Sequence, residues 1–210
     1  PRSSLETGFP EKVPLFREDP SAFIGKILEP FADAFDLCLN DVELRSRFGA
    51  DTAALVRSMN RLDNKDWLPP LLLCLRQHNE GIYNNVEDFI FRLERLAYYL
   101  FMVRGDVNQR MARYADVIDE LEPTTERKQR LGRRERSPGL GLTRNEAYSF
   151  FKALNGDVYL SSRVVKPLLL RLEQASTDGS ANYDYPIISV EHVCPQTVKE
   201  GSQWSTWFKN

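Results

Sequence analysis

The sequence predicts a mainly α fold: a helical bundle, a short helical subdomain, and a single β-strand near the C-terminus. Apolar residues recur every three or four positions over most of the first 121 residues, as on the buried face of amphipathic helices. This periodicity disappears between residues 123 and 142 and then returns. The segment 185–190, with sequence Tyr-Pro-Ile-Ile-Ser-Val, is the one convincing strand candidate. With 210 residues, of which 42% are hydrophobic, the chain can form one large domain or two small ones.

The first helices of the bundle carry local signals. An apolar face from Phe23 to Cys38 is interrupted at Pro30, which predicts a kink or two short helices. Asp51 is predicted to cap the next helix. The segment 68–75 follows as a helix that is apolar on nearly every side, so we expect it to be central.

The clearest amphipathic stripe runs from residue 86 to residue 101. A turn at residues 104–106 leads into a second helix that ends near Leu121, which predicts an antiparallel helical hairpin. Further along, Thr143 and Glu146 have the spacing of a capping box, and a helix after them is predicted to end at 155–156. Another helix is predicted to be entered near Pro167.

Charge and cysteine content exclude several classes of protein. The chain has 28 Lys and Arg against 30 Asp and Glu, a net charge of -2, so any basic surface must be local. Three widely spaced cysteines fit neither a disulfide framework nor a CxxC zinc site, which favours a reducing cytoplasm. No apolar run can span a bilayer, so no membrane location is predicted. Because the chain begins at proline rather than methionine, we expect flanking segments to be missing.

A basic connector separates the two predicted helical parts. Six basic residues lie within residues 123–142: Arg127, Lys128, Arg130, Arg133, Arg134 and Arg136. They can follow the phosphates of DNA, but Glu126 and Glu135 interrupt them, and charge runs are often solvated loops. Both interpretations stay open.

The chemistry-bearing motif follows the predicted strand: Glu191-His192-x-x-Pro195-Gln-Thr, and then Trp204-x-x-Trp207-Phe208. Together with the preceding Leu-rich helix, this pattern resembles the C-terminal His-Me-finger (HNH-type) nuclease domain of GmrSD-type modification-dependent restriction endonucleases. The Trp-Leu-Pro-Pro-Leu-Leu segment at 67–72 and the hairpin at 86–121 resemble the helical region upstream of that nuclease.

The resemblance implies a metal-dependent DNA endonuclease of a cytoplasmic, prokaryotic phage-defence system. His192 would be the general base that deprotonates water, and Glu191 would ligate Mg²⁺ or Mn²⁺ in the complete protein. The implied partners are modified phage DNA and an NTP-binding domain, in cis or as a separate subunit. If the strand is straight, Glu191 and His192 point to opposite faces, so a twist or bulge is needed for both to reach one site.

The same resemblance implies that the ββα-metal finger is incomplete in this chain. The second strand and the metal-bearing helix would follow His192, but the sequence given stops at Asn210. We therefore expect no bound metal and no activity in this polypeptide alone. The implied organisation is a helical bundle at 1–122, the connector at 123–142, and the first part of the nuclease domain at 143–210.

Each of these functional interpretations has a structural alternative. A histidine near an apolar strand is often structural, and His78 is expected at a helix end facing solvent. Cys194 fits a small buried hydrophobic residue, and the tryptophans at 204 and 207 more often pack than stack on bases. The alternative function is an all-helical adaptor or DNA-binding module in which the Glu-His-x-x-Pro string is a coincidence.

Overall fold

The structure is a computed structural model that describes residues 3–122, 139–177, 189–190, 195 and 197–207. Over these ranges it is mainly α, as predicted, and they contain no β-strand. Residues 185–188 of the predicted strand lie outside the described ranges, and Ser189 and Val190 are not in a strand. No helix among the described residues is long and apolar enough to cross a membrane.

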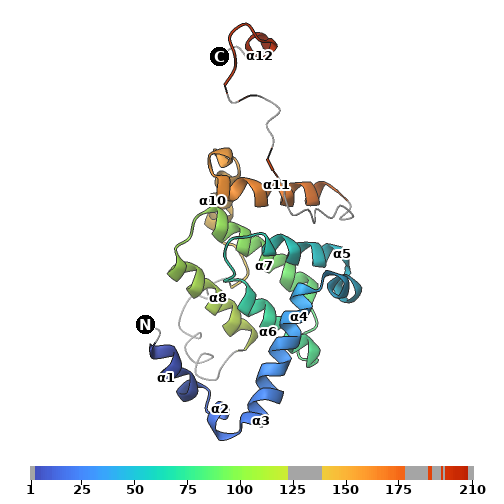
Figure 1. Ribbon diagram of the computed structural model, residues 1–210, viewed down its shortest axis with the longest axis vertical. Helices are drawn as coiled ribbons and strands as arrows, with labels where there is room; N and C mark the ends of the chain where they lie inside the picture. Colours follow the sequence, from blue (N-terminus) through green and yellow to red (C-terminus); the bar gives the residue numbers. More distant parts are fainter. Residues whose placement is uncertain (1–2, 123–138, 178–188, 191–194, 196, 208–210) are drawn as a thin grey trace.

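An N-terminal arm lies at the lower end of the molecule (Figure 1). It consists of short helices: α1 (Ser3–Lys12), α2 (Leu15–Glu18) and α3 (Pro20–Phe23). One phenylalanine from each helix, Phe9, Phe16 and Phe23, meets the other two edge to face, with ring centroids 5.4 to 6.2 Å apart. These aromatic contacts hold the three short helices together.

The interruption predicted at Pro30 takes the form of a π-helix. The segment η1 (Ile24–Leu28) connects α3 directly to α4 (Glu29–Leu39), and the Glu29 N–H donates to the carbonyl of Ile24, five residues earlier. Proline has no N–H, and its ring crowds the carbonyl one turn earlier, so a wider turn just before Pro30 relieves the clash. The chain therefore stays helical through the proline.

The central bundle is formed by α5 (Asp41–Asn60), α6 (Leu68–Asn79), α7 (Val86–Met102) and α8 (Val107–Leu121). The helix expected to begin at Asp51 instead continues from Asp41 across a break at Gly49, where φ is 85° and glycine is favoured. As predicted, α6 is central: it packs against α4, α7 and α8, and Leu71, Cys74 and Leu75 have no exposed surface.

The apolar stripe predicted for residues 86–101 is the buried face of α7. Phe89, Ile90, Leu93 and Leu96 are each at most 2% exposed. The predicted turn follows it, and Asp106 begins α8 with a capping box to Gln109. α6 packs against both helices of the predicted hairpin, which are joined mainly through α6 rather than by packing on each other.

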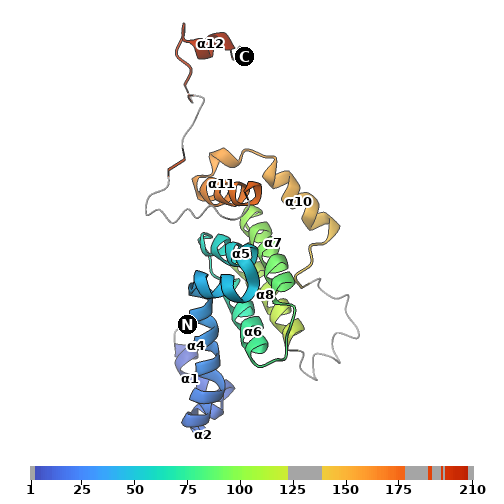
Figure 2. The same ribbon diagram turned by 90° about the vertical axis from the view of Figure 1, so that its right-hand side faces the viewer.

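The upper end of the bundle is covered by α10 (Arg144–Leu154), η2 (Val158–Leu160) and α11 (Ser162–Ser176) (Figures 1 and 2). The Thr143–Glu146 capping box is confirmed, and α10 ends at Asn155 as predicted. The helix predicted to be entered near Pro167 begins at Ser162 instead, so that interpretation was wrong. The described chain also contains a short α12 (Gln203–Trp207), which lies apart from the other helices in Figure 1.

One hydrophobic core extends from the bundle to the C-terminal helices. Leu140, Val164 and Leu168 belong to the same buried cluster as the side chains of α5, α6 and α7. The division of the chain at residues 122 and 142 stays a prediction.

Polar contacts fix α11 on the bundle. Arg171 Nε donates to the Oε1 of Glu94 at 2.5 Å, and Arg163 forms an ion pair with Asp63. The hydroxyl of Tyr98, which shares a 2.7 Å hydrogen bond with the hydroxyl of Ser58, also donates to the carbonyl of Pro167 in α11 at 3.4 Å. Burial raises the pKa of Glu94 above its usual range, and the Arg171 guanidinium lowers this pKa only in part.

Replacing Arg171 by Met tests this contact. Glu94 is 4% exposed, so Arg171→Met leaves a buried carboxylate without its guanidinium. We expect the free energy of unfolding at pH 7 to fall by about 3 kcal/mol, as measured by urea denaturation.

The pH dependence gives the control. Because the folded-state pKa of Glu94 is raised, its protonated form contributes stability that is fully present below the unfolded pKa and is lost as pH rises through the folded pKa. The loss in Arg171→Met should therefore shrink as the pH is lowered toward about 5. The double variant Arg171→Met/Glu94→Gln should recover most of the loss at pH 7. A double variant as unstable as the single one would contradict a buried-charge origin.

Candidate functional site

Every site residue predicted from the sequence lies outside the described residues. This holds for His192, for Glu191, and for the basic residues Arg127, Lys128, Arg130, Arg133, Arg134 and Arg136. The structure does describe the helices to which these segments are attached. For the candidate site, the structure therefore gives the geometry of the points where these segments are attached.

Both ends of the segment 123–138 are anchored on α8. At the first end, the side chain of Gln77 donates from Nε2 to the carbonyl of Leu121 at 3.2 Å. At the second end, residues 139–146 are bound by Arg113, which lies eight residues before Leu121 on the same helix. Along a helix axis this separation is roughly 12 Å. The described residues on either side of the basic segment, Leu121 and Gly139, are thus both held at α8.

Arg113 holds the second end through its whole guanidinium. Its Nε donates to the carbonyl of Gly139 at 2.7 Å, and its Nη2 donates to the carbonyl of Gly141 at 2.6 Å. Both Nη atoms reach the Glu146 carboxylate, at 2.9 and 3.3 Å. The side chain of Arg113 is only 12% exposed, so these charge-assisted bonds are partly shielded from water.

Glu146 joins this anchor to the start of α10. Its carboxylate accepts from the backbone N–H of Thr143 at 2.8 Å, which completes the capping box. Burial alone would raise the pKa of Glu146, but the hydrogen bonds from Thr143 and Arg113 outweigh it, and the pKa lies below its usual range. Gly139 has φ of 46°, a backbone conformation in which other residues are strained, so glycine is favoured where the chain returns to α8.

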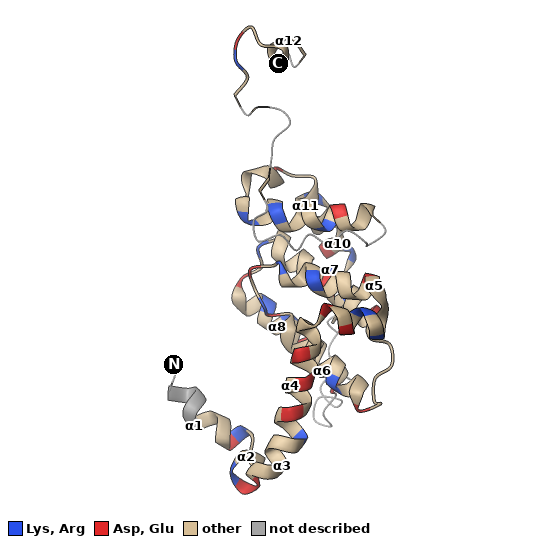
Figure 3. Ribbon diagram, turned by 45° about the vertical axis from the view of Figure 1, so that its right-hand side comes forward, with Lys and Arg blue, Asp and Glu red and all other residues tan. Residues whose placement is uncertain are grey.

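The charges on α4 argue against DNA binding at that helix. Glu29, Asp33 and Asp36 are exposed at a spacing that places them along one stripe, visible as the red segments of α4 in Figure 3. Such a stripe repels phosphates. It agrees with the expectation that any basic surface of this nearly neutral chain is local.

The described residues on either side of His192 carry no strand. Val190 is half-buried and Thr197 is exposed. Further along, Trp204 and Trp207 of α12 meet edge to face with centroids 5.7 Å apart, although Trp207 remains 65% exposed. The tryptophans therefore pack on each other, and one keeps a free surface.

The described residues contain no group of three or more His, Cys, Asp or Glu side chains that could hold a metal ion. Cys38 and Cys74 are buried, and burial raises the pKa of each thiol to about 12. His78 is half-buried rather than solvent-facing: its Nδ1 lies 3.0 Å from the carbonyl of Tyr83, and its ring packs on Phe48. These groups have structural roles.

A feature that the sequence analysis missed is an apolar groove between α10, η2 and α11. It has a volume of about 320 Å³. Its lining includes Leu154, Val158, Leu169 and Leu172. The run of consecutive leucines at 168–170 was a usable signal, since one buried helix face does not need three in succession. Arg113 had no comparable signal, because a single arginine on a polar helix face indicates nothing by itself.

Replacing Arg113 by Met tests the anchor. Its loss leaves Glu146 and two backbone carbonyls without a partly buried donor. We expect the free energy of unfolding to fall by about 3 kcal/mol, together with faster hydrogen exchange at the start of α10. Urea denaturation and amide exchange measure the two effects.

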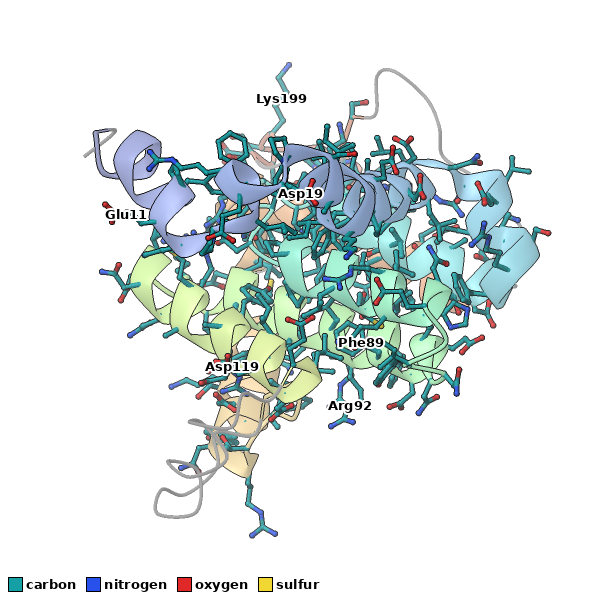
Figure 4. All side chains as sticks on the ribbon, turned by 90° about the horizontal axis from the view of Figure 1, so that it is seen from below. Glu11, Asp19, Phe89, Arg92, Asp119 and Lys199 are labelled. Atoms are coloured by element: carbon teal, nitrogen blue, oxygen red, sulfur yellow. The ribbon has the colours of Figure 1, made fainter. Side chains whose placement is uncertain are left out.

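Arg92→Met is the matched control. Arg92 extends away from α7 in Figure 4, and its ion pair with Asp88, at 3.6 Å, is exposed. Its removal should change stability by about 0.5 kcal/mol or less. Equal effects of the two substitutions would show that Arg113 is not an anchor.

The chain was compared with known proteins at three levels. No family model matches it, and no significant match was found among curated proteins or among solved structures. Function is therefore inferred from the sequence motif and from the geometry of the described residues.

Proposed function

We propose that this chain is part of a metal-dependent DNA endonuclease of a phage-defence, modification-dependent restriction system. His192 is the general base that accepts a proton from the attacking water, and the cleaved bond is a phosphodiester. The observation that carries the proposal is the string Glu191-His192-x-x-Pro195-Gln-Thr after an apolar segment. The target is modified phage DNA, and an NTP-binding domain acts with the nuclease.

The helical frame supports this proposal indirectly. α11 is fixed on the bundle by Arg171 and Arg163, and the motif begins 15 residues after that helix ends at Ser176. A base must be held within hydrogen-bond reach of its proton. A firmly attached helix upstream provides a fixed point from which such a position can be built.

The donor chemistry fits a hard cation. Glu191 offers carboxylate oxygens, which Mg²⁺ and Mn²⁺ prefer, and no competing group of ligands occurs among the described residues. When bound, such an ion stabilises negative charge on the phosphate oxygens. A general base must be unprotonated, and histidine is the residue type whose charge changes close to physiological pH.

DNA binding is proposed for the basic segment between the two anchors on α8. Its residues 123–138 carry six Lys or Arg against two Glu. Phosphate contacts by such side chains do not depend on base sequence and weaken as salt is added. The described residues on either side of the segment, Leu121 and Gly139, are bonded to the bundle.

The second candidate function is a helical DNA-binding module without catalysis. It is favoured by the same anchored basic segment, which binds phosphates whether or not His192 is a base. DNA binding that requires the basic segment, together with no metal-dependent cleavage by the full-length protein, would select this second function.

The catalytic proposal is tested by His192→Ala in the full-length protein with Mg²⁺ or Mn²⁺. Cleavage should fall by about 100- to 10,000-fold, the usual contribution of a positioned general base. DNA binding and the circular dichroism spectrum should be unchanged. Single-turnover cleavage of modified DNA is the measurement.

The matched control is His78→Gln, since the chain has only two histidines and His78 contacts Tyr83 and Phe48 rather than the motif. This variant should keep nearly full cleavage if it folds. Near-normal cleavage by His192→Ala would rule out the role of His192 as base.

The DNA-binding proposal is tested by changing Arg133, Arg134 and Arg136 to Gln together. Each lost phosphate contact removes about 0.9 from the slope of log affinity against log salt. Nonspecific binding should therefore weaken, and the slope should become shallower by up to about 2.7. Fluorescence anisotropy at several salt concentrations measures both quantities.

The control removes three exposed positive charges elsewhere: Arg92 and Arg95 on α7, and Lys166 on α11. It gives the same change in net charge. If both triple variants lose the same affinity and slope, the effect is one of overall charge, and the basic segment is a solvated loop.

A further inference from the structure

The continuous helix formed by η1 and α4 carries a stripe of large apolar side chains on an outer face. α4 packs on α5 and α6, and its inner face is buried at Ala34, Leu37 and Cys38. On another face, side chains three or four positions apart form the outer stripe, which consists of Ile24, Leu28, Phe31, Phe35 and Leu39. All of these except Phe31 are 40 to 64% exposed. The outer stripe is roughly 22 Å long, or about four helical turns.

A groove lies beside the middle of the outer stripe. It has a volume of about 390 Å³ and is formed by α4, α6 and α8. Its lining includes Phe31 of the outer stripe, Leu72 of α6 and Ile118 of α8. Lys65 and Glu122 are the charged residues of the lining, and their charges cancel. A row of exposed apolar side chains beside a groove is the kind of surface that binds an amphipathic helix.

Negative charge borders the outer stripe. Residues 20–39 contain three acidic residues, Glu29, Asp33 and Asp36, against one basic residue, Lys26. At 3.6 residues per turn, the acidic stripe lies roughly 120° around α4 from the outer stripe, so the two stripes and the buried face each take about a third of the helix surface. The acidic stripe is exposed (Figure 3). A partner on the outer stripe therefore meets negative charge along one edge.

This charge selects the kind of partner. A second copy of the chain would bring the same acidic stripe to the contact and double its negative charge. DNA and anionic lipid headgroups are repelled for the same reason. Lys or Arg side chains beside the apolar face of a partner helix would instead be attracted to this edge. Charge complementarity thus favours a helix that is apolar on one face and basic beside it.

We propose that the outer stripe binds an amphipathic helix of a partner protein, with apolar side chains against Leu28, Phe35 and Leu39 and basic side chains against the acidic stripe. The apolar contacts supply most of the affinity, and the charges determine the choice of partner. The inference goes beyond the proposed nuclease function, because it requires neither His192 nor DNA binding.

A synthetic helical peptide is the probe. It has about 18 residues, enough to span the outer stripe, with Leu at every third or fourth position and Lys elsewhere. The control peptide has Glu in place of each Lys. Fluorescence anisotropy with the 210-residue chain should show that the basic peptide binds at least about tenfold tighter than the acidic one. Added salt should reduce this ratio, because it screens exposed charges.

A pair of leucine substitutions tests the apolar contact. Leu28→Gln with Leu39→Gln changes two exposed side chains, so helical circular dichroism should be unchanged. Affinity for the basic peptide should fall about tenfold or more, since both leucines lose apolar contact with it. The matched control is Leu160→Gln with Leu172→Gln, which changes two exposed leucines at the upper end of the molecule. It should change affinity by less than about twofold, because these side chains lie outside the proposed contact.

A triple variant tests the acidic stripe. Glu29→Gln, Asp33→Asn and Asp36→Asn together should lower affinity for the basic peptide about tenfold, because each lost carboxylate removes an exposed charge contact. The control neutralises three exposed carboxylates elsewhere through Glu87→Gln, Asp88→Asn and Asp157→Asn. This control gives the same change in net charge and should lower affinity by less than about threefold.

Four results would overturn the proposal. The first is a basic peptide that does not bind, or that binds no tighter than the acidic peptide. The second is an equal loss of affinity in the two leucine pairs, which would place the peptide elsewhere. The third is an equal loss in the two triple variants, which would reduce the effect to overall charge. The fourth is a dimer of the chain in sedimentation velocity that Leu28→Gln with Leu39→Gln dissociates, which would assign the outer stripe to a second copy.

Discussion

The position of α11 on the central bundle depends on a largely buried ion pair between Glu94 and Arg171. The two residues are 77 positions apart in the sequence, and Glu94 has almost no exposed surface. A buried carboxylate without a partner is strongly unfavourable. α11 therefore cannot leave α7 without exposing or stranding that charge. The hydroxyl of Tyr98, which lies against Ser58 and reaches the carbonyl of Pro167 at 3.4 Å, adds a second constraint at the same contact.

In a second arginine–carboxylate pair, Arg113 with Glu146, the pKa of the carboxylate shifts the opposite way, so its contribution to stability has the opposite pH dependence. The pKa of Glu146 is lowered, so its carboxylate contributes stability that is present above the unfolded pKa and is lost as pH falls through the folded pKa. The pKa of Glu94 is raised, so its contribution changes with the opposite sign. The difference follows from the number of donors. Glu146 receives bonds from Thr143 as well as Arg113, whereas burial dominates at Glu94.

The sequence was most informative where a local pattern determines the structure. The stripe of α7, the turn at residues 104–106 and the capping box at Thr143 appear as predicted, because local spacing along the chain sets each of them. Proline was harder to interpret. At Pro30 a π-helix absorbs the missing N–H, and Pro167 sits inside α11, since packing against the bundle outweighs the local cost.

The candidate site was less predictable for a different reason. Arg113 binds residues 26 to 33 positions away, so no local pattern could identify it. The groove requires α10 and α11 to be placed side by side, which depends on the Glu94 contact across the fold. For the motif at Glu191 and His192, the sequence indicates the chemistry but not the position. Its residue types suggest chemistry, but their spacing does not determine where they lie, and they fall outside the described residues.

The stabilising contacts of the described residues are concentrated in one core and in a few arginine contacts at its edge. Helices α4 to α8 and α11 share one buried cluster, against which α10 packs, and arginines on α8 and α11 tie its outer elements to it. A binding segment attached between two fixed points loses less entropy on ordering than a free one. The basic segment between Leu121 and Gly139 is attached in this way, since both ends are bonded to the bundle. The proposed DNA contacts would therefore start from two fixed points at α8, while the acidic stripe of α4 disfavours phosphate at that helix. A nearly neutral chain can then have one local site for DNA without a basic surface overall.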